Sequence, residues 1–105
     1  MVRFTVLYNI TPTSTFDWAY YMEKHLPLAA RLLSPLGLIR TEVDRGVGAF
    51  PPGSPSHYHA IAHLFFASMD ELNAALGATA AELSADMAKY YNDTATFQIS
   101  EVVPF

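Results

Sequence analysis

The sequence predicts a single α+β domain built on one antiparallel sheet, and three observations lead to that fold class. Four segments are rich in β-branched and aromatic residues, as strands are. Two longer segments carry apolar residues at helical spacing. The order is strand, helix, strand, strand, helix, strand, within 105 residues that suffice for one domain. This is the split βαβ pattern of a ferredoxin-like βαββαβ fold, in which a four-stranded antiparallel sheet carries its helices on one face.

The first half of the chain predicts a strand, a helix and a second strand. Residues 2–8 (VRFTVLY) alternate as a strand does, and residues 9–15 form a turn region. A helix is predicted from about residue 16 to residue 33. We expect it to be disturbed at Leu26-Pro27, because proline lacks a backbone donor and crowds the carbonyl of Glu23. Pro35 and Gly37 end this helix, and residues 38–45 (LIRTEVDR) predict the second strand.

The second half begins with a long loop. Residues 46–56 (GVGAFPPGSPS) contain three glycines and three prolines, and residues 58–66 (YHAIAHLFF) predict the third and most apolar strand. Ser68 and Glu71 match the capping box that begins a helix. We expect that helix to stop at Gly77, a further helical piece to cover residues 79–91, and a fourth strand to cover residues 96–103.

The composition argues against several functional classes. Net formal charge is −4 and only 15% of the residues are charged, without a basic cluster, so we expect no nucleic-acid partner. No apolar run approaches the ~20 residues of a membrane span, and the first residues lack a signal-peptide pattern. Cysteine is absent, which removes disulfides and cysteine metal sites. We therefore expect a cytoplasmic protein with no membrane partner.

The hydrophobic content predicts two apolar surfaces besides the core. Hydrophobic residues make up 51% of the chain. If the helices cover one face of the sheet, the other face is left bare, and we expect a second copy of the chain to cover it in a homodimer. Apolar surface beyond that need is expected to line a ligand cavity.

One histidine, His25, falls on the apolar stripe of the predicted first helix. The stripe comprises Trp18, Tyr21, Met22, His25, Leu28, Ala29 and Leu32. An inward imidazole has a pKa near working pH and can act as a general base or acid, and Tyr21 one turn earlier can hold a substrate oxygen. The alternative is a buried His25 that bonds a main-chain carbonyl and only fastens the helix to the sheet.

The other histidines lie on or beside the third predicted strand. His57, His59 and His63 share one face, but His63 lies about 13 Å from His59 at ~3.3 Å per residue, so the three form a poor metal site. His63 either completes a pocket with His25 or is a hydrogen-bonded core or interface residue. Haem ligation by one of the histidines stays an open alternative.

Several segments together resemble the EthD family, which is named after an ether-degradation gene cluster. The most specific match is Tyr20-Tyr21 followed by His25-Leu26-Pro27-Leu28; residues 16–17, 42–46, 60–68 and 98–102 match more loosely. The resemblance covers nearly all of residues 1–105 and implies a ferredoxin-like subunit of a dimeric α+β barrel. Relatives on that scaffold include cofactor-free cyclases, dehydratases, isomerases and monooxygenases, and haem-degrading enzymes, so the resemblance implies the fold more than the chemistry.

The functional prediction is cofactor-free acid–base chemistry, of a dehydratase, cyclase or isomerase kind, on a hydrophobic oxygenated small molecule. The expected catalytic residues are His25, Tyr21 and His63, and the expected substrate-binding residues are Trp18, Met22, Tyr8 and Phe65. No metal and no other cofactor are expected. Two alternatives stay open: a non-catalytic ligand-binding or accessory protein of a catabolic pathway, and a haem- or metal-binding protein.

Overall fold

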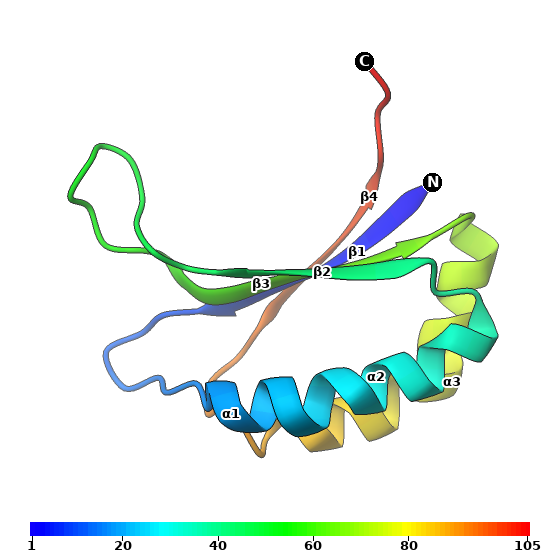
Figure 1. Cartoon of the computed structure of the whole chain (residues 1–105), viewed down its shortest axis with the longest axis horizontal. Helices are drawn as coiled ribbons and strands as arrows, with labels where there is room; N and C mark the ends of the chain where they lie inside the picture. The colour runs from blue at the N-terminus through cyan, green and yellow to red at the C-terminus, as the bar shows by residue number, and fades with distance from the viewer.

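The computed structural model describes all of residues 1–105 and contains one sheet and two helical segments (Figure 1). The strands are β1 (Val2–Asn9), β2 (Arg40–Arg45), β3 (Tyr58–Phe66) and β4 (Thr96–Glu101). The first helical segment comprises α1 (Trp18–Tyr20), the π-helical η1 (Tyr21–His25), α2 (Leu26–Leu33) and the 3-10 turn η2 (Ser34–Leu36). The second is α3 (Met69–Met87), and neither segment contains a stretch that could span a membrane.

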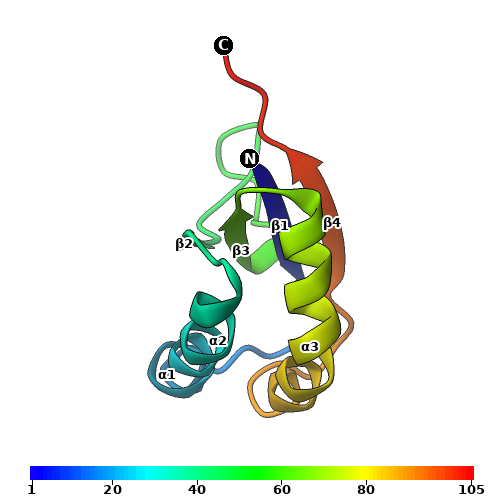
Figure 2. The same ribbon diagram turned by 90° about the vertical axis from the view of Figure 1, so that its right-hand side faces the viewer.

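The strands pair in the order β2-β3-β1-β4, and every pair is antiparallel. Both helical segments lie against the same face of this sheet (Figure 2). This arrangement is the ferredoxin-like βαββαβ fold, so the predicted fold class is confirmed.

Strand alternation divides the side chains of the sheet between two faces. Phe4, Val6 and Tyr8 of β1 pack toward the helices, so the residues between them point the other way. The register extends this division to β3, where Ala60, Ala62, Leu64 and Phe66 lie opposite the even residues of β1. We call the two sides the helix-covered face and the open face.

The first helical segment continues through Pro27 instead of breaking there. In η1 the amide of Leu26 donates to the carbonyl of Tyr21, five residues back, and Pro27 then lies in the first turn of α2. Proline is tolerated in the first turn of a helix, and the wider π turn before Pro27 accommodates the backbone N–H group that proline lacks. The predicted disturbance is therefore present as a π turn.

This π turn changes which residues face inward. The buried positions are Tyr21, His25, Ala29 and Leu33, spaced four residues apart. The expected stripe was partly wrong, because Met22 is 53% exposed.

Helix α3 is continuous, which corrects the prediction of two pieces separated at Gly77. It begins as predicted, with the amide of Glu71 donating to Oγ of Ser68 at 3.2 Å. Gly77 lies in open surroundings, where a Cβ atom would meet nothing within 4 Å. A mid-helix glycine costs about 1 kcal/mol relative to alanine, which the packing of a long helix can offset. Two strands are shorter than predicted: β2 covers residues 40–45 instead of 38–45, and β4 covers residues 96–101 instead of 96–103.

Two segments project away from the helices, on the side of the open face (Figure 1). One is the predicted loop between β2 and β3, which is closed by a bridge between Ala49 and Ser54. The other is the chain after β4. Both expose large apolar side chains, with Val47 and Phe50 in the loop and Val103 and Phe105 in the tail.

Candidate active site

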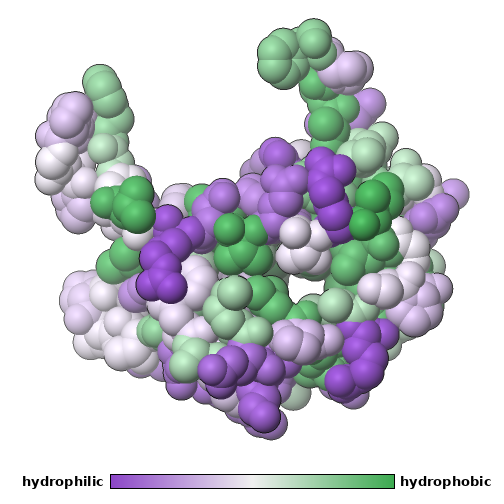
Figure 3. Space-filling model, viewed as in Figure 1, coloured by the Kyte–Doolittle hydropathy of each residue, from purple (hydrophilic) through white to green (hydrophobic).

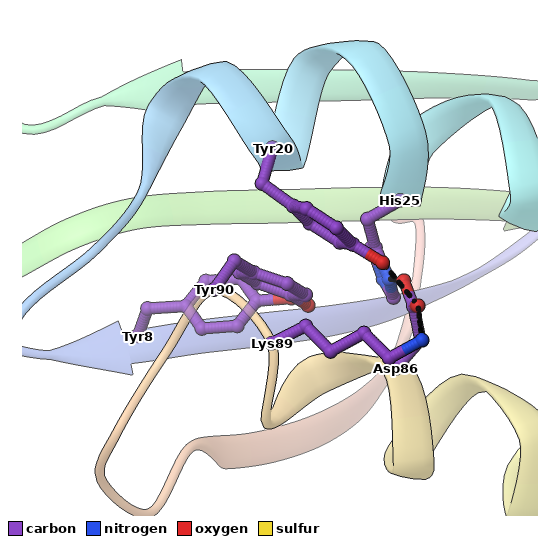
Figure 4. A network of polar contacts seen from close by, with 6 residues as sticks. All are labelled: Tyr8, Tyr20, His25, Asp86, Lys89 and Tyr90. Carbon is purple, nitrogen blue, oxygen red and sulfur yellow. Dashed lines mark hydrogen bonds and ion pairs between the residues drawn. The ribbon is translucent and has the colours of Figure 1, made fainter.

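His25 lies at the end of the π turn and points into the space between the helices and the sheet. The residue is only 7% exposed. Its Nδ1 atom lies 2.9 Å from Oδ2 of Asp86, on the neighbouring helix α3 (Figure 4). A side chain of the first helical segment is thus joined to one of the second across the helical layer.

Asp86 is itself buried and has three polar neighbours. The hydroxyl of Tyr20 donates to its Oδ1 atom at 2.7 Å, and Nζ of Lys89 lies 3.8 Å from the same oxygen (Figure 4). With His25 on Oδ2, both carboxylate oxygens are engaged. A buried carboxylate requires such partners, because desolvation without them would drive it to the neutral acid.

The charges of this pair follow from burial and hydrogen bonding. Burial lowers the pKa of His25 below its ordinary 6.5, although the bond to Asp86 acts in the opposite direction. Burial alone would raise the pKa of Asp86, but the hydrogen bonds from Tyr20 and His25 outweigh that effect and lower it. At neutral pH the pair is therefore a neutral imidazole and a carboxylate. The proton lies on Nδ1, where it can be donated to Asp86, and Nε2 carries a free lone pair.

Two tyrosine rings, of Tyr21 and Tyr90, contact the imidazole, and Tyr8 packs against both of them. Tyr21 stacks on His25 with ring centroids 5.6 Å apart, and Tyr90 lies at 4.5 Å. The hydroxyls of Tyr8 and Tyr90 are 2.7 Å apart and share one hydrogen bond. The hydroxyl of Tyr21 is fully buried beside that of Tyr8 and makes no hydrogen bond of ordinary geometry. Burial raises the pKa of all three tyrosines, so the hydroxyls stay protonated and can donate.

A cavity of about 290 Å³ opens beside this cluster. Thirteen of its fifteen lining residues are hydrophobic. Figure 3 shows an opening between the sheet and the helical layer, bordered by apolar surface. The lining residues come from both helical segments and three strands: Phe4, Val6, Tyr8, Tyr21, His25, Leu26, Ala29, Ala62, Leu64, Leu76, Ala80, Leu83, Ser84, Met87 and Phe97. His25, Tyr8 and Tyr21 thus meet an apolar space in which an imidazole can accept a proton.

A comparison with protein families matches residues 12–94 to the model of the EthD domain. The matched segment holds both His25 and Asp86. The chain belongs to the EthD family.

Comparison with solved structures agrees with this assignment. An EthD-like protein from Ralstonia eutropha is 29% identical, with a TM-score of 0.89 over 98% of this chain and 92% of that chain. An ethyl tert-butyl ether (EthD) family protein from Bacillus halodurans is 23% identical, with a TM-score of 0.77 over 98% of this chain and 99% of that chain. A dimeric ferredoxin-like protein of unknown function from Thermobifida fusca is 14% identical, with a TM-score of 0.52 over 96% and 90%. A comparison with curated proteins finds no match.

The EthD fold gathers only part of the residue set that the sequence predicts for the site. His25, Tyr21 and Tyr8 all line the cavity. Trp18 and Met22 do not line it; Trp18 packs under the guanidinium of Arg45, 4.1 Å from the ring centroid. Trp18 is half-buried against Phe16 and Tyr21 at the edge of the core, and Met22 lies on the outer side of the first helical segment.

His63 and Phe65 are not brought together with His25. Their odd positions on β3 place them on the open face, with the sheet between them and the cavity. His63 lies between Thr5 Oγ1 at 3.3 Å and Asp44 Oδ2 at 3.2 Å. Phe65 lies under Arg40, whose guanidinium carbon is 3.9 Å from the ring centroid. The open alternative of a hydrogen-bonded His63 matches this placement, whereas a shared His25–His63 pocket within one chain does not.

The remaining histidines are also separated from the site. His59 bonds Oγ of Ser14 at 2.8 Å and stacks on Phe16, and His57 is exposed. No group of three His, Asp or Glu side chains converges as a metal ion would require.

Asp86 is the functional residue that the sequence reasoning missed. Along an unbroken helix the buried positions Leu72, Ala75, Thr79 and Asp86 form one stripe. An acidic residue on such a stripe signals a buried partner. The predicted break at Gly77 divided this stripe between two helices, so Asp86 was not recognised as part of it. The stripe is evident only because α3 is continuous.

Proposed function

We propose that this EthD-family protein performs cofactor-free acid–base chemistry on a hydrophobic oxygenated small molecule, with His25 as the base. The observation that carries the proposal is the hydrogen bond between His25 and the buried Asp86 at the wall of an apolar cavity. A histidine whose two nitrogens were both bonded to the protein would have no lone pair left for a guest molecule. Here only Nδ1 is engaged by a protein group, which leaves Nε2 for a guest molecule.

The carboxylate of Asp86 serves His25 in two ways. It accepts the Nδ1 proton and so holds the imidazole in the tautomer whose Nε2 accepts a proton. Once Nε2 is protonated, the imidazolium is paired with a negative charge that is already in place. Asp86 does not line the cavity, so it is a positioning residue, held in turn by Tyr20.

The tyrosine hydroxyls provide the complementary electrophilic part. Tyr8 and Tyr21 line the cavity beside His25, and both have raised pKa values through burial. We propose that Tyr21 donates a hydrogen bond to a substrate oxygen, where negative charge develops as the proton leaves carbon.

The resulting step is a proton transfer within the cavity. A C–H bond next to a carbonyl group breaks, its proton moves to Nε2 of His25, and the electron pair moves to the carbonyl oxygen as an enolate. The hydroxyl of Tyr21 holds that oxygen. Return of the proton at another carbon gives an isomer, and its delivery to a leaving hydroxyl group gives water and an alkene.

We further propose that the protein is a homodimer that associates through the open face, as in a dimeric α+β barrel. Leu7 and Ile61 supply apolar side chains to that face, and Phe65 lies there beneath Arg40. The Thermobifida fusca neighbour is described as dimeric. The apolar loop and tail project on the same side and would flank a second copy (Figure 1).

The base is tested with nitrobenzisoxazole, an aromatic probe that reacts when a base removes its single heterocyclic proton. The N–O bond then breaks, a nitrile forms, and a coloured phenolate reports the rate. His25→Ala and His25→Gln should each lower the rate by roughly 10²–10⁴-fold. Glutamine can still donate to Asp86, so the second variant keeps the contact between the helices.

His57→Ala is the matched control, because His57 is exposed and outside the cavity. Its rate should equal that of the native protein. Native turnover no faster than with free imidazole would contradict the proposal. Tight binding of the probe without turnover would favour the alternative of a ligand-binding protein.

A further inference from the structure

The two oxygens of the Asp86 carboxylate serve different sides of the molecule. Oδ2 lies 2.9 Å from Nδ1 of the buried His25, whereas Oδ1 accepts a hydrogen bond of 2.7 Å from the hydroxyl of Tyr20 (Figure 4). A hydroxyl that donates to a carboxylate at this distance makes a strong, charge-assisted hydrogen bond. Tyr20 and His25 therefore compete for the charge of one carboxylate.

This competition matters because Asp86 is the one charged group that favours protonation of His25. The imidazole otherwise contacts the rings of Tyr21 and Tyr90, whose hydroxyls stay protonated. A carboxylate spreads its negative charge over both oxygens, so a strong donor at Oδ1 leaves less charge at Oδ2 to stabilise an imidazolium ion. Each donor that reaches Oδ1 consequently favours the neutral imidazole.

Lys89 acts on the same oxygen from the surface. Its Nζ atom lies 3.8 Å from Oδ1 of Asp86, and its side chain is 64% exposed. Against burial, which raises the pKa of Asp86, the hydrogen bond from Tyr20 and the charge of Lys89 both lower it. Because solvent screens an exposed charge, we expect Lys89 to contribute less than Tyr20 does.

The position of Tyr20 fits a role exerted through Asp86 and not on a guest molecule. The side chain is half-buried and does not line the cavity. Its amide donates to Oδ1 of the N-capping Asp17 at 3.0 Å, and its ring stacks on that of Tyr90 at 6.2 Å. These contacts involve the backbone and the ring, so they persist when the hydroxyl alone is removed.

We propose that Tyr20, assisted by Lys89, is a positioning residue that limits the negative charge which Asp86 presents to His25, and so keeps the imidazole neutral. The hydroxyl thus does more than hold the carboxylate in place. Asp86 without these donors would favour the imidazolium ion, and a base that is already protonated cannot accept a proton from a guest molecule. This inference rests on the proposed function of His25, but its central measurement is a titration that requires no turnover.

The test is the titration of His25 in Tyr20→Phe, followed through the NMR signals of the histidine rings. Phenylalanine keeps the stack on Tyr90 and removes only the donor, so the pKa of His25 should be higher than in the native protein. The signal of His25 is assigned by its absence from His25→Gln. Tyr58→Phe is the matched control and should leave the titration unchanged, because Tyr58 neither lines the cavity nor acts on Asp86.

The pH dependence of the rate with nitrobenzisoxazole provides a second measurement. Tyr20→Phe should lower the rate at pH 5 by at least about twofold relative to the native protein, because more of the imidazole is protonated there, and leave the plateau rate within about twofold. Lys89→Gln should change the profile in the same direction by a smaller amount, which disappears at about 1 M salt. Lys24→Gln is its control, because Lys24 is exposed and acts on neither member of the pair.

A His25 pKa in Tyr20→Phe that equals or falls below the native value would overturn the inference, and Tyr20 would then only hold Asp86 in place. A lower plateau rate with an unshifted pH profile would overturn it too. Should Tyr20→Phe fail to fold, Lys89→Gln at low ionic strength is judged by the same criterion, since an exposed side chain can be replaced without disturbing the core. A raised pKa in a protein that does not turn over the probe would leave the inference in place and remove the proposed function.

Discussion

At the residue scale, the activity proposed here depends on one neutral imidazole. Because burial lowers the pKa of His25 below 6.5, the folded protein resists protonation of this ring. The rate with nitrobenzisoxazole should therefore reach its plateau below pH 6.5 and fall only at more acidic pH, as His25 gains a proton. A rate that is still rising between pH 7 and pH 8 would contradict the assignment of His25 as the base.

The same pKa shift has a consequence for stability. The unfolded chain takes up a proton on His25 as pH falls past 6.5, whereas the folded protein does not. The contribution of His25 to the free energy of unfolding is therefore complete above pH 6.5 and decreases as pH falls toward the lower folded pKa. Denaturant titrations between pH 7.5 and pH 5 should show this loss in the native protein and a smaller one in His25→Gln. Equal pH dependence in both proteins would mean that the ring titrates normally.

Asp86→Asn tests the positioning role of the carboxylate. The amide can accept from Nδ1 or donate to it, so the tautomer is no longer fixed, and loss of the negative charge should lower the pKa of His25 further. We expect the probe rate to fall at least about tenfold and stability to fall by about 1–3 kcal/mol. The pKa is read from the histidine NMR signals, and Glu82→Gln, exposed on the same helix, is the control. An unchanged His25 pKa in Asp86→Asn would exclude the role.

The sequence predicted half of this pair. His25 and Tyr21 could be predicted from the sequence, because helical periodicity and a neighbouring proline mark them within a dozen residues. Asp86 is 61 positions away from His25, and its partner is decided by how two helices cross the sheet. Likewise, His63 and Phe65 could not be assigned to a face until the register of β3 was known, since a shift of one residue reverses every side chain.

At the element scale, the two helical segments show where local sequence rules succeed and fail. Pro27 was expected to disturb its helix and does so, as a π turn that keeps Tyr21, His25 and Ala29 on one side. Gly77 was expected to end a helix and does not. Both residues weaken a helix locally, but only proline removes a hydrogen-bond donor, whereas a helical glycine costs a modest amount that long-range packing can offset.

The continuity of α3 can be tested with a pair of glycine variants. Gly77→Ala should stabilise the protein by about 0.5–1 kcal/mol, because the new methyl group meets no neighbour and alanine favours the helix. Gly37→Ala should destabilise it, since Gly37 has a φ of 105° and a Cβ there would lie 2.6 Å from Oε2 of Glu71. Melting temperatures from circular dichroism give both values. Destabilisation by Gly77→Ala would indicate that the helix is interrupted as the sequence first suggested.

At the scale of the whole molecule, the order of strands and helices was the most predictable property. Each segment carries its own period, and the rules for short connections leave only a few compact arrangements of that order, of which the observed sheet is one. The second face of the sheet was less predictable. It combines Leu7, Ile61 and Phe65 with the His63–Asp44 pair and arginines, so it is neither the plain apolar surface that overall composition suggests nor an ordinary solvated face.

The proposed dimer through this face gives the final prediction. The native protein should sediment with twice the 11.6 kDa mass of the chain. Ile61→Glu would add a second carboxylate directly opposite Asp44 on the open face and should raise the dimer dissociation constant by at least about tenfold, because neighbouring like charges that lose solvent are strongly unfavourable at an interface. Ala81→Lys, on the exposed side of α3, should leave the dimer intact. If both variants and the native protein sediment as monomers, the open face does not mediate self-association, and the proposal of a homodimer is wrong.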